Sequence, residues 1–358
     1  MKGNRILYPV AVLVIVIAII VVSDKLGDKK PAAGELQFFP SLSAGTIGSI
    51  TIRDENTSIR VRRQGDVWVV SKADAVKDEV SAAPHVADSA KSDSTSQLTD
   101  SAQFGSEFPV DSAAIAVALE KIIGLRKDAL ISENPEKQSI FQVDTVKGLT
   151  VQIADNSGKQ IGTVIIGKSG ADYSSHYVRA KGSNSVYMAG GSIKYSFFTD
   201  IKQWRNKSIL KFDKSTAKGI TLAKFDGDMI TLAQADSGNP WQILQPINSP
   251  AKTDAVEAII DKLCKLNATD FQDETLADTA MGFDKPELGV TISFKNGSSR
   301  NIMFGKKNSD KKYWVKTDGK EQIYLVGEYV FNQINKKLDD LKGEPLVKPV
   351  EADTLKTK

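Results

Sequence analysis

Cysteine and histidine are almost missing from this chain of 358 residues, which contains one Cys and two His. A single thiol, Cys264, cannot form an intramolecular disulfide or a zinc site built on cysteine. His85 and His176 lie too far apart in sequence to indicate a zinc motif. No sequence motif pairs either histidine with the Cys264 thiol, as a catalytic cysteine would require. The hydrolase and metalloprotease signatures G-x-S-x-G and H-E-x-x-H are also missing. The sequence therefore indicates no catalytic motif, no metal site and no cofactor.

An excess of charge is missing as well, because 47 Lys and Arg stand against 44 Asp and Glu and give a net charge of +3. The basic residues are spread among acidic ones without forming a stripe, so nucleic-acid binding is not indicated. Apolar residues make up 41% and charged residues 25%, as in folded globular proteins. The length suits two domains of ordinary size.

Charged residues are missing altogether between Ile6 and Val22, a run of 17 residues. A helix of this length spans about 26 Å, against a bilayer core of about 30 Å. A cleaved signal peptide is the alternative, but no small-residue cleavage site follows the run. Basic residues flank both ends of the run, so their distribution alone does not decide which end is cytoplasmic. The short basic head before the run resembles that of a signal-anchor, whose amino terminus stays in the cytoplasm. We expect a cytoplasmic head (1–5), a transmembrane signal-anchor (6–23) and an exported body.

The rest of the chain contains two diverged copies of one pattern. Each copy opens with three short alternating runs that end at a tryptophan, continues with an amphipathic helix and returns to strands joined by hairpin turns. Each copy closes with a second amphipathic helix, expected from Ile193 to Trp204 and from Val330 to Leu341. The helices begin at Ser112 and Thr253, whose hydroxyls are expected N-caps. The matching segments include 49–71 with 219–244, 112–126 with 253–267, 141–153 with 281–294, and 177–190 with 314–327.

Hairpins interrupted by single helices predict an α+β fold, with an antiparallel sheet and helices in each of two tandem modules. A stretch rich in Ser, Ala and Asp interrupts the first copy and is expected to be flexible. The predicted organisation after the anchor is a linker (24–45), a first repeat (46–212) with a flexible insertion (73–107), a second repeat (213–343) and a disordered tail (344–358).

One segment, Gly162 to Ser169, formally fits the phosphate-binding pattern G-x-x-x-x-G-K-[ST]. A P-loop follows a strand and opens a helix, whereas the residues TVII inside this segment themselves read as a strand. We therefore expect strand and turn, and no nucleotide. Asp144 and Asp284 occupy equivalent places in the two copies, and their context predicts turn formation in preference to a catalytic carboxylate pair.

Aromatic and basic side chains alternate along equivalent strands of the two copies. Such surfaces bind glycans, peptides or partner proteins, although a plain solvated sheet face is the simpler interpretation. The candidate binding residues are Tyr177, Arg179, Tyr187, Trp314, Lys316 and Tyr324.

Several stretches together resemble the bacterial domain-of-unknown-function family 4340. They are the tryptophan strands VWVVS and PWQIL, FDKPELGVTISF, the I-G-K and F-G-K turns, and YVRAKGSNSVYMA with the helix through QWRNK. The insertion after Lys72 and the FQVDTV segment depart from the family pattern. Members are membrane-anchored proteins found beside ABC-type transporters related to the gliding-motility auxiliary system. The family offers no catalytic residues to carry over.

The resemblance implies a single-pass protein of the bacterial inner membrane with a periplasmic body and ABC-type transporter subunits as partners. Our leading hypothesis is a non-enzymatic accessory or scaffold protein. A module that binds cell-wall glycan or another polymer is the alternative, and a hydrolase with an unrecognised site is the third.

Overall fold

The computed structural model describes residues 36–73, 107–235 and 239–344. They form two compact units divided between Trp204 and Arg205, here called the first and the second module. The expected head, signal-anchor and most of the linker lie outside the described residues, as do the body of the insertion and nearly all of the tail. Within the described ranges, no helix is long and apolar enough to span a membrane.

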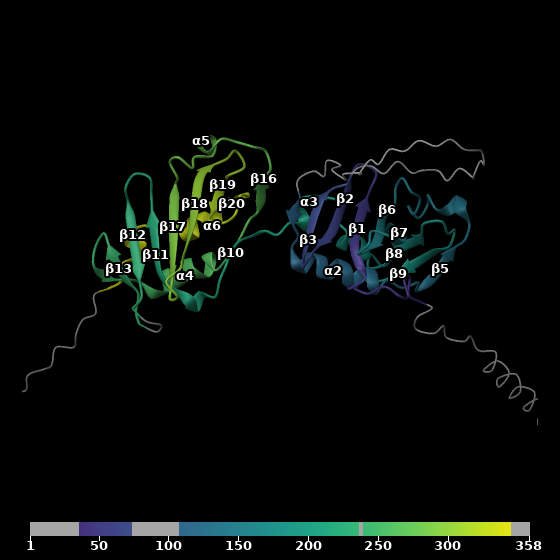
Figure 1. Ribbon diagram of the computed structural model, residues 1–358, viewed down its shortest axis with the longest axis horizontal. Helices are drawn as coiled ribbons and strands as arrows, with labels where there is room; N and C mark the ends of the chain where they lie inside the picture. Colours follow the sequence, from purple (N-terminus) through teal and green to yellow (C-terminus); the bar gives the residue numbers. More distant parts are fainter. Residues whose placement is uncertain (1–35, 74–106, 236–238, 345–358) are drawn as a thin grey trace, which may run out of the picture. The chain divides into compact units, whose positions relative to one another are not determined.

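The first module is a nine-stranded antiparallel sheet with helices packed against it (Figure 1). Its strand order is β4-β3-β2-β1-β6-β7-β8-β9-β5. The strands are β1 (Ile47–Arg53), β2 (Ser58–Gln64), β3 (Val67–Lys72), β4 (Phe108–Pro109), β5 (Ala129–Ser132), β6 (Leu149–Asp155), β7 (Gln160–Ser169), β8 (His176–Ala180) and β9 (Val186–Ala189). The helices are α2 (Ser112–Ile123), η1 (Pro135–Lys137), η2 (Ile193–Ser196) and α3 (Ile201–Trp204).

The second module repeats this sheet in the order β14-β13-β12-β11-β17-β18-β19-β20-β16. Its strands are β10 (Ser208–Lys211), β11 (Ala217–Ala223), β12 (Met229–Ala233), β13 (Gln242–Gln245), β14 (Ser249–Pro250), β15 (Lys265–Asn267), β16 (Asp270–Gln272), β17 (Leu288–Phe294), β18 (Ser299–Lys307), β19 (Lys312–Thr317) and β20 (Ile323–Gly327). Its helices are η3 (Lys214–Thr216), α4 (Thr253–Leu263), α5 (Asp278–Met281), α6 (Glu328–Ile334) and α7 (Leu338–Leu341). The two strand orders correspond position by position, which confirms the α+β prediction and the tandem duplication.

Alternating apolar residues place one face of each sheet in a core. Ile50 and Ile52 of β1 pair with Ile153 and Val151 of β6, and all four side chains are buried. The corresponding pairs in the second module join Ile220 and Leu222 of β11 to Ile292 and Val290 of β17. Both first strands carry a register shift at the same place, between Ile47 and Ser49 in β1 and between Ala217 and Gly219 in β11. The repeat is therefore preserved at the level of single residues.

The predicted helical stripes pack on these core faces. Ile115, Leu119 and Ile122 of α2 are buried, as are Val256, Ile260 and Leu263 of α4. The predicted hydroxyl caps were wrong. Asp111 caps α2 by accepting from the amides of Ala113 and Ala114, while the N-cap of α4 is Lys252, which has no side-chain cap. The carboxylate one residue earlier fits the N-cap geometry better than the Ser112 hydroxyl.

Each module begins earlier than its sequence pattern indicates. In the second, β10 pairs with β15, ahead of the expected start at residue 213. In the first, the Phe38 amide donates to the Leu125 carbonyl oxygen at 2.8 Å, and Phe38 is buried in the core. Residues 36–45 thus belong to the folded module and not to a linker. Strand pairings as short as these contain too few residues to show an alternation of apolar and polar side chains, so hydrophobic periodicity does not predict them.

The last helix of each copy is broken, although its apolar spacing predicts one continuous helix. The first module has η2 and α3, and the second has α6 and α7, with residues 335–337 between them. The apolar positions still face the core, since Ile193, Phe197 and Trp204 are buried, as are Ile334 and Leu341. The break leaves a short non-helical connection that lines a pocket together with the first hairpin turn of each sheet.

Candidate functional site

The six aromatic and basic candidates do not form one surface, because they divide between the two faces of their sheets. Val178 lies opposite Tyr187, and Val315 lies opposite Tyr324, so both tyrosines share the core face with these buried valines. Tyr324 is only 5% exposed. Tyr187 packs against the core and has the Lys127 ammonium 5.7 Å from its ring centroid. The other four candidates lie on the opposite face.

On that opposite face Arg179 is buried and holds a connection in place. Its Nε donates to the Val143 carbonyl oxygen, and its Nη1 donates to the Ser183 carbonyl oxygen, both at 2.9 Å. Burial lowers the pKa of Arg179, while the Asp144 carboxylate opposes that shift. Tyr177 stacks on Phe141 with ring centroids 4.6 Å apart. The solvated sheet face expected here is therefore covered by residues 141–143.

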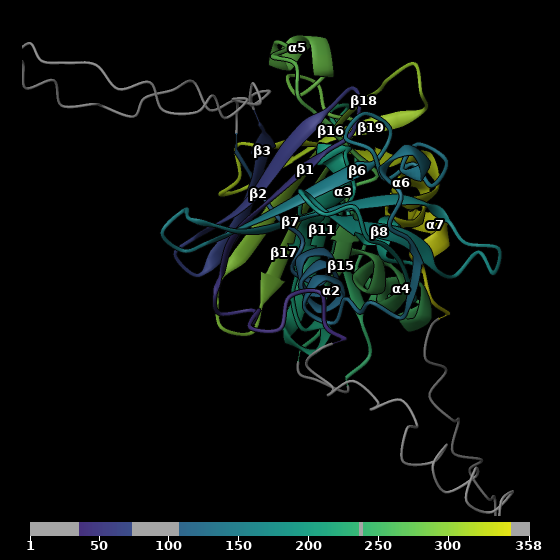
Figure 2. The same ribbon diagram turned by 90° about the vertical axis from the view of Figure 1, so that its right-hand side faces the viewer.

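The second module uses the equivalent basic position for the same purpose. The Lys316 ammonium lies 4.5 Å from the Phe283 ring centroid and pairs with the Asp278 carboxylate at 2.7 Å. The Trp314 indole N–H donates to the Gln272 side chain at 3.0 Å. Figure 2 shows α5, at the start of this connection, standing away from α4, α6 and α7. In both modules the basic side chain, Arg179 or Lys316, thus fastens a connection that crosses the sheet face opposite the core helices, whereas Trp314 bonds to strand β16.

The same crossing explains the Gly-Lys motif. Gly162 to Ser169 lie within β7, which supports the expected strand and gives no helix N-terminus for a phosphate. A Cβ on Gly167 would overlap the Phe141 carbonyl oxygen, and one on Gly305 would overlap the Met281 carbonyl oxygen. The conformation of both connections therefore requires glycine at this point of the strand.

Three other candidates have structural partners. The Asp144 carboxylate accepts from the amides of Val146 and Lys147, which confirms the predicted turn. Cys264 is partly exposed at the end of α4, and its thiol faces the Asp261 carbonyl oxygen at 3.6 Å. His176 is fully buried, with Nε2 at 3.3 Å from the Ser169 hydroxyl, and burial lowers its pKa. Across the described residues, no three His, Cys, Asp or Glu side chains gather as a metal site would require.

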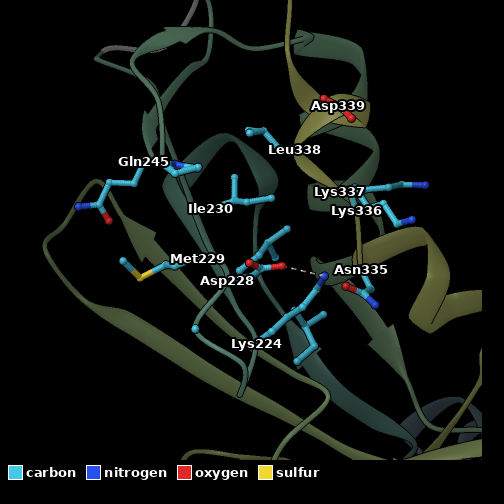
Figure 3. Close-up of a pocket in the computed structure, with 14 residues that line it drawn as sticks. Lys224, Asp228, Met229, Ile230, Gln245, Asn335, Lys336, Lys337, Leu338 and Asp339 are labelled. Carbon is cyan, nitrogen blue, oxygen red and sulfur yellow. Dashed lines mark ion pairs between the residues drawn. The ribbon is translucent and has the colours of Figure 1, made fainter.

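A cavity of about 700 Å³ lies in the second module between the β11–β12 turn and the α6–α7 connection (Figure 3). Its apolar lining includes Leu222, Ile230 and Leu338. Figure 3 shows Ile230 and Leu338 at the hollow, with the Gln245 side chain at one side. Lys224 extends from the turn along the cavity, and Lys336 belongs to the connection. The size and the mixture of apolar walls with a few polar groups are typical of ligand sites.

The first module has a cavity of about 630 Å³ at the equivalent place. It is lined by the β1–β2 turn, by the end of β3 and by the η2–α3 connection, including Asp54, Lys72 and Thr199. Lys72 and Ala73 stand where Gln245 and Pro246 line the second cavity. The duplication has therefore preserved a hollow as well as a fold. The sequence gives no direct signal for it, because its walls come from segments about 140 residues apart in the first module and 110 in the second.

The polar groups of the two cavities differ. Asp54 follows β1 and accepts hydrogen bonds from the Asn56 and Thr57 amides, at 2.9 and 2.7 Å, and from the hydroxyls of Thr57 and Thr199. Burial alone would raise the pKa of Asp54, but these hydrogen bonds outweigh it and lower the pKa. Lys224 follows β11 at the equivalent position and pairs at 3.7 Å with Asp228 of its own turn.

Comparison with known proteins gives one positive result. Two adjacent segments, 103–240 and 241–356, match the family described as domain of unknown function (DUF4340). Their boundary falls between β12 and β13, inside the second module, so the family segments are offset from the compact units. No curated protein and no solved structure matches the chain. The chain belongs to the DUF4340 family and carries two tandem copies of its domain.

Proposed function

We propose that the protein is a membrane-anchored accessory subunit whose two modules bind an envelope partner, such as the subunits of an ABC-type transporter. The observation that carries this proposal is the cavity found at the same place in both modules. A duplicated hollow with different polar groups suits the recognition of two different features of a partner.

The proposed anchor is the apolar run Ile6 to Val22. With the short basic head before it in the cytoplasm, the modules would lie on the periplasmic side of the inner membrane. The non-enzymatic character is supported by the partners of the reactive-looking groups. Arg179 holds backbone carbonyl oxygens, Asp144 forms a turn, and Lys316 pairs with Asp278. These side chains stabilise the fold and need no chemical role.

The glycan-binding alternative loses its original support. It required aromatic and basic side chains along one exposed strand face, whereas Arg179 and Tyr324 are buried and Tyr187 lies on the core face. The cavities are the more favourable place for recognition.

The test is chemical crosslinking of the full-length tagged protein in its own cells, followed by solubilisation and mass spectrometry. Recovery of transporter permease or ATPase subunits would support the accessory function. Recovery of wall polymer alone, or of no envelope protein, would contradict it.

A further inference from the structure

A hydrogen bond joins two walls of the first cavity. The Asp54 carboxylate lies on the β1–β2 turn, and the Thr199 hydroxyl on the η2–α3 connection donates to it. Asp54 is fixed further by the amides of its own turn. This bridge joins two segments that are 145 residues apart in the chain and leaves the carboxylate satisfied.

The second cavity has two lysines at these two positions. Lys224 follows β11 as Asp54 follows β1, and Lys336 lies two residues before α7 as Thr199 lies two residues before α3. Two ammonium groups cannot form the bridge that a carboxylate and a hydroxyl form, because both are donors and neither accepts a hydrogen bond. An anion placed between them would restore the connection between turn and helix.

The charged side chains that line the second cavity are compatible with a bound anion. Three lysines and two aspartates line the cavity, the third lysine being Lys337 and the aspartates Asp228 and Asp339. Asp228 pairs with Lys224 at the long distance of 3.7 Å, and its side chain is 75% exposed. Asp339 is exposed at the rim, where Figure 3 shows it beyond Leu338. An exposed pair of this kind is weak, so an entering carboxylate can replace it.

The walls beyond the lysines suit an apolar group. Leu222 and Leu288 are buried at the base of the cavity, and Ile230 and Leu338 are partly exposed to it. The volume of about 700 Å³ is in the range of small-molecule sites. We propose that the second cavity binds an amphipathic organic anion, with its apolar body against Leu222, Ile230 and Leu338 and its anionic group between Lys224 and Lys336.

The test uses octanoate as the probe and the full chain in phosphatidylcholine nanodiscs, with empty discs as the blank. Ligand-detected NMR measures the affinity for octanoate and for the neutral analogue octanol. We expect octanoate to bind at least about tenfold more tightly than octanol. Equal affinity for the two probes, or no binding of octanoate, would overturn the proposal.

Variants then locate the anion. Lys224→Asp with Lys336→Thr gives the second cavity the pair found in the first, and we expect it to weaken octanoate binding at least about tenfold. Lys224→Arg with Lys336→Arg keeps both charges and should retain binding. The matched control Lys72→Gln removes a lysine from the first cavity and should change the affinity by less than about twofold.

Circular dichroism must show that each variant is folded. A folded Asp–Thr variant that binds octanoate like the unaltered protein would overturn the proposal. Binding of acetyl-Glu-Leu-Glu-Leu-Glu through the same lysines, without binding of octanoate, would also overturn it and would identify an acidic peptide as the occupant. Either result can be distinguished from failure to find a transporter partner, because the probe assay requires no partner.

Discussion

The two modules agree in all nine sheet positions but differ where a turn meets the last helix. The shared part consists of buried apolar pairs, such as Ile52 with Val151 and Leu222 with Val290, and of the glycines at the crossing connection. The differing part consists of side chains around a cavity, such as Asp54 and Lys224. The comparison teaches that packing preserves the module while the polar groups at its cavity have diverged, as expected where the two copies recognise different chemistry.

The largest expected effect tests the shared part. Gly167→Ala and Gly305→Ala each place a Cβ onto a backbone carbonyl oxygen of the crossing connection. Backbone cannot move aside as a side chain can, so each change should cost about 3 kcal/mol, at the upper end of overpacking effects. Hydrogen-exchange mass spectrometry of the full chain reads each module separately. We expect Gly167→Ala to lower protection in the first module and Gly305→Ala to lower it in the second. Loss of protection from only one of the two variants would show that the two crossings are not equivalent.

The next effect separates two residues at one register position. Arg179→Ala leaves the carbonyl oxygens of Val143 and Ser183 without their donor and should cost about 2 kcal/mol. Lys316→Ala removes a partly exposed ion pair and should cost less than about 1 kcal/mol. The free energy of opening from hydrogen exchange measures both. Equal losses of free energy in the two variants would contradict the larger stabilisation that we assign to the buried Arg179.

A smaller effect concerns the backbone of the crossing connection. Gln142 has φ of 55°, and Gly282 has φ of 79° at the equivalent position. The left-handed conformation penalises a residue with Cβ, so Gln142→Gly should stabilise the first module by about 0.5–1 kcal/mol after the greater chain entropy of glycine is included. Gly282→Ala should instead destabilise the second module, since its Cβ would also press on the Lys306 backbone. Thermal unfolding checks both signs.

A pH-dependent difference completes the comparison. His176 is buried, and its pKa in the folded first module lies below the ordinary value of 6.5. As pH falls through 6.5, the unfolded chain binds the proton first, so the first module loses stability until pH passes the lower folded pKa. The second module contains no histidine and should show no such loss in this window. Hydrogen exchange between pH 8 and 6, with His176→Phe as the control, should show the loss in the unaltered first module only.

The sequence could predict the duplication, the apolar stripes and the turns, because these depend on local spacing. Ile115 and Leu119 follow helical periodicity, and Gly158 and Gly297 stand in hairpin turns with positive φ. It could not assign Tyr187 and Tyr324 to the core face, since apolar residues flank both tyrosines on either side and no apolar–polar alternation distinguishes the two faces of these strands. The connection that buries Arg179 comes from 36 residues away, and no local pattern indicates it.

The cavities escaped prediction for a related reason. Continuous apolar spacing from Ile193 to Trp204 and from Val330 to Leu341 suggested unbroken helices, but each breaks before its last turn. The one available signal was the exchange of Asp54 for Lys224 directly after equivalent strands. That exchange indicates a difference between two cavities only when the residues across each cavity, Thr199 and Lys336, are known.

Both cavities are proposed to face a partner, and site-specific photo-crosslinking in cells tests this orientation most directly. The crosslinking residue replaces Glu55 on the β1–β2 turn, Phe225 on the β11–β12 turn, or Lys295 at the opposite end of the second sheet; all three are exposed. We predict envelope-protein adducts, including transporter subunits, from positions 55 and 225 and none from 295. The same adducts from all three positions, or none from 55 and 225, would contradict the account.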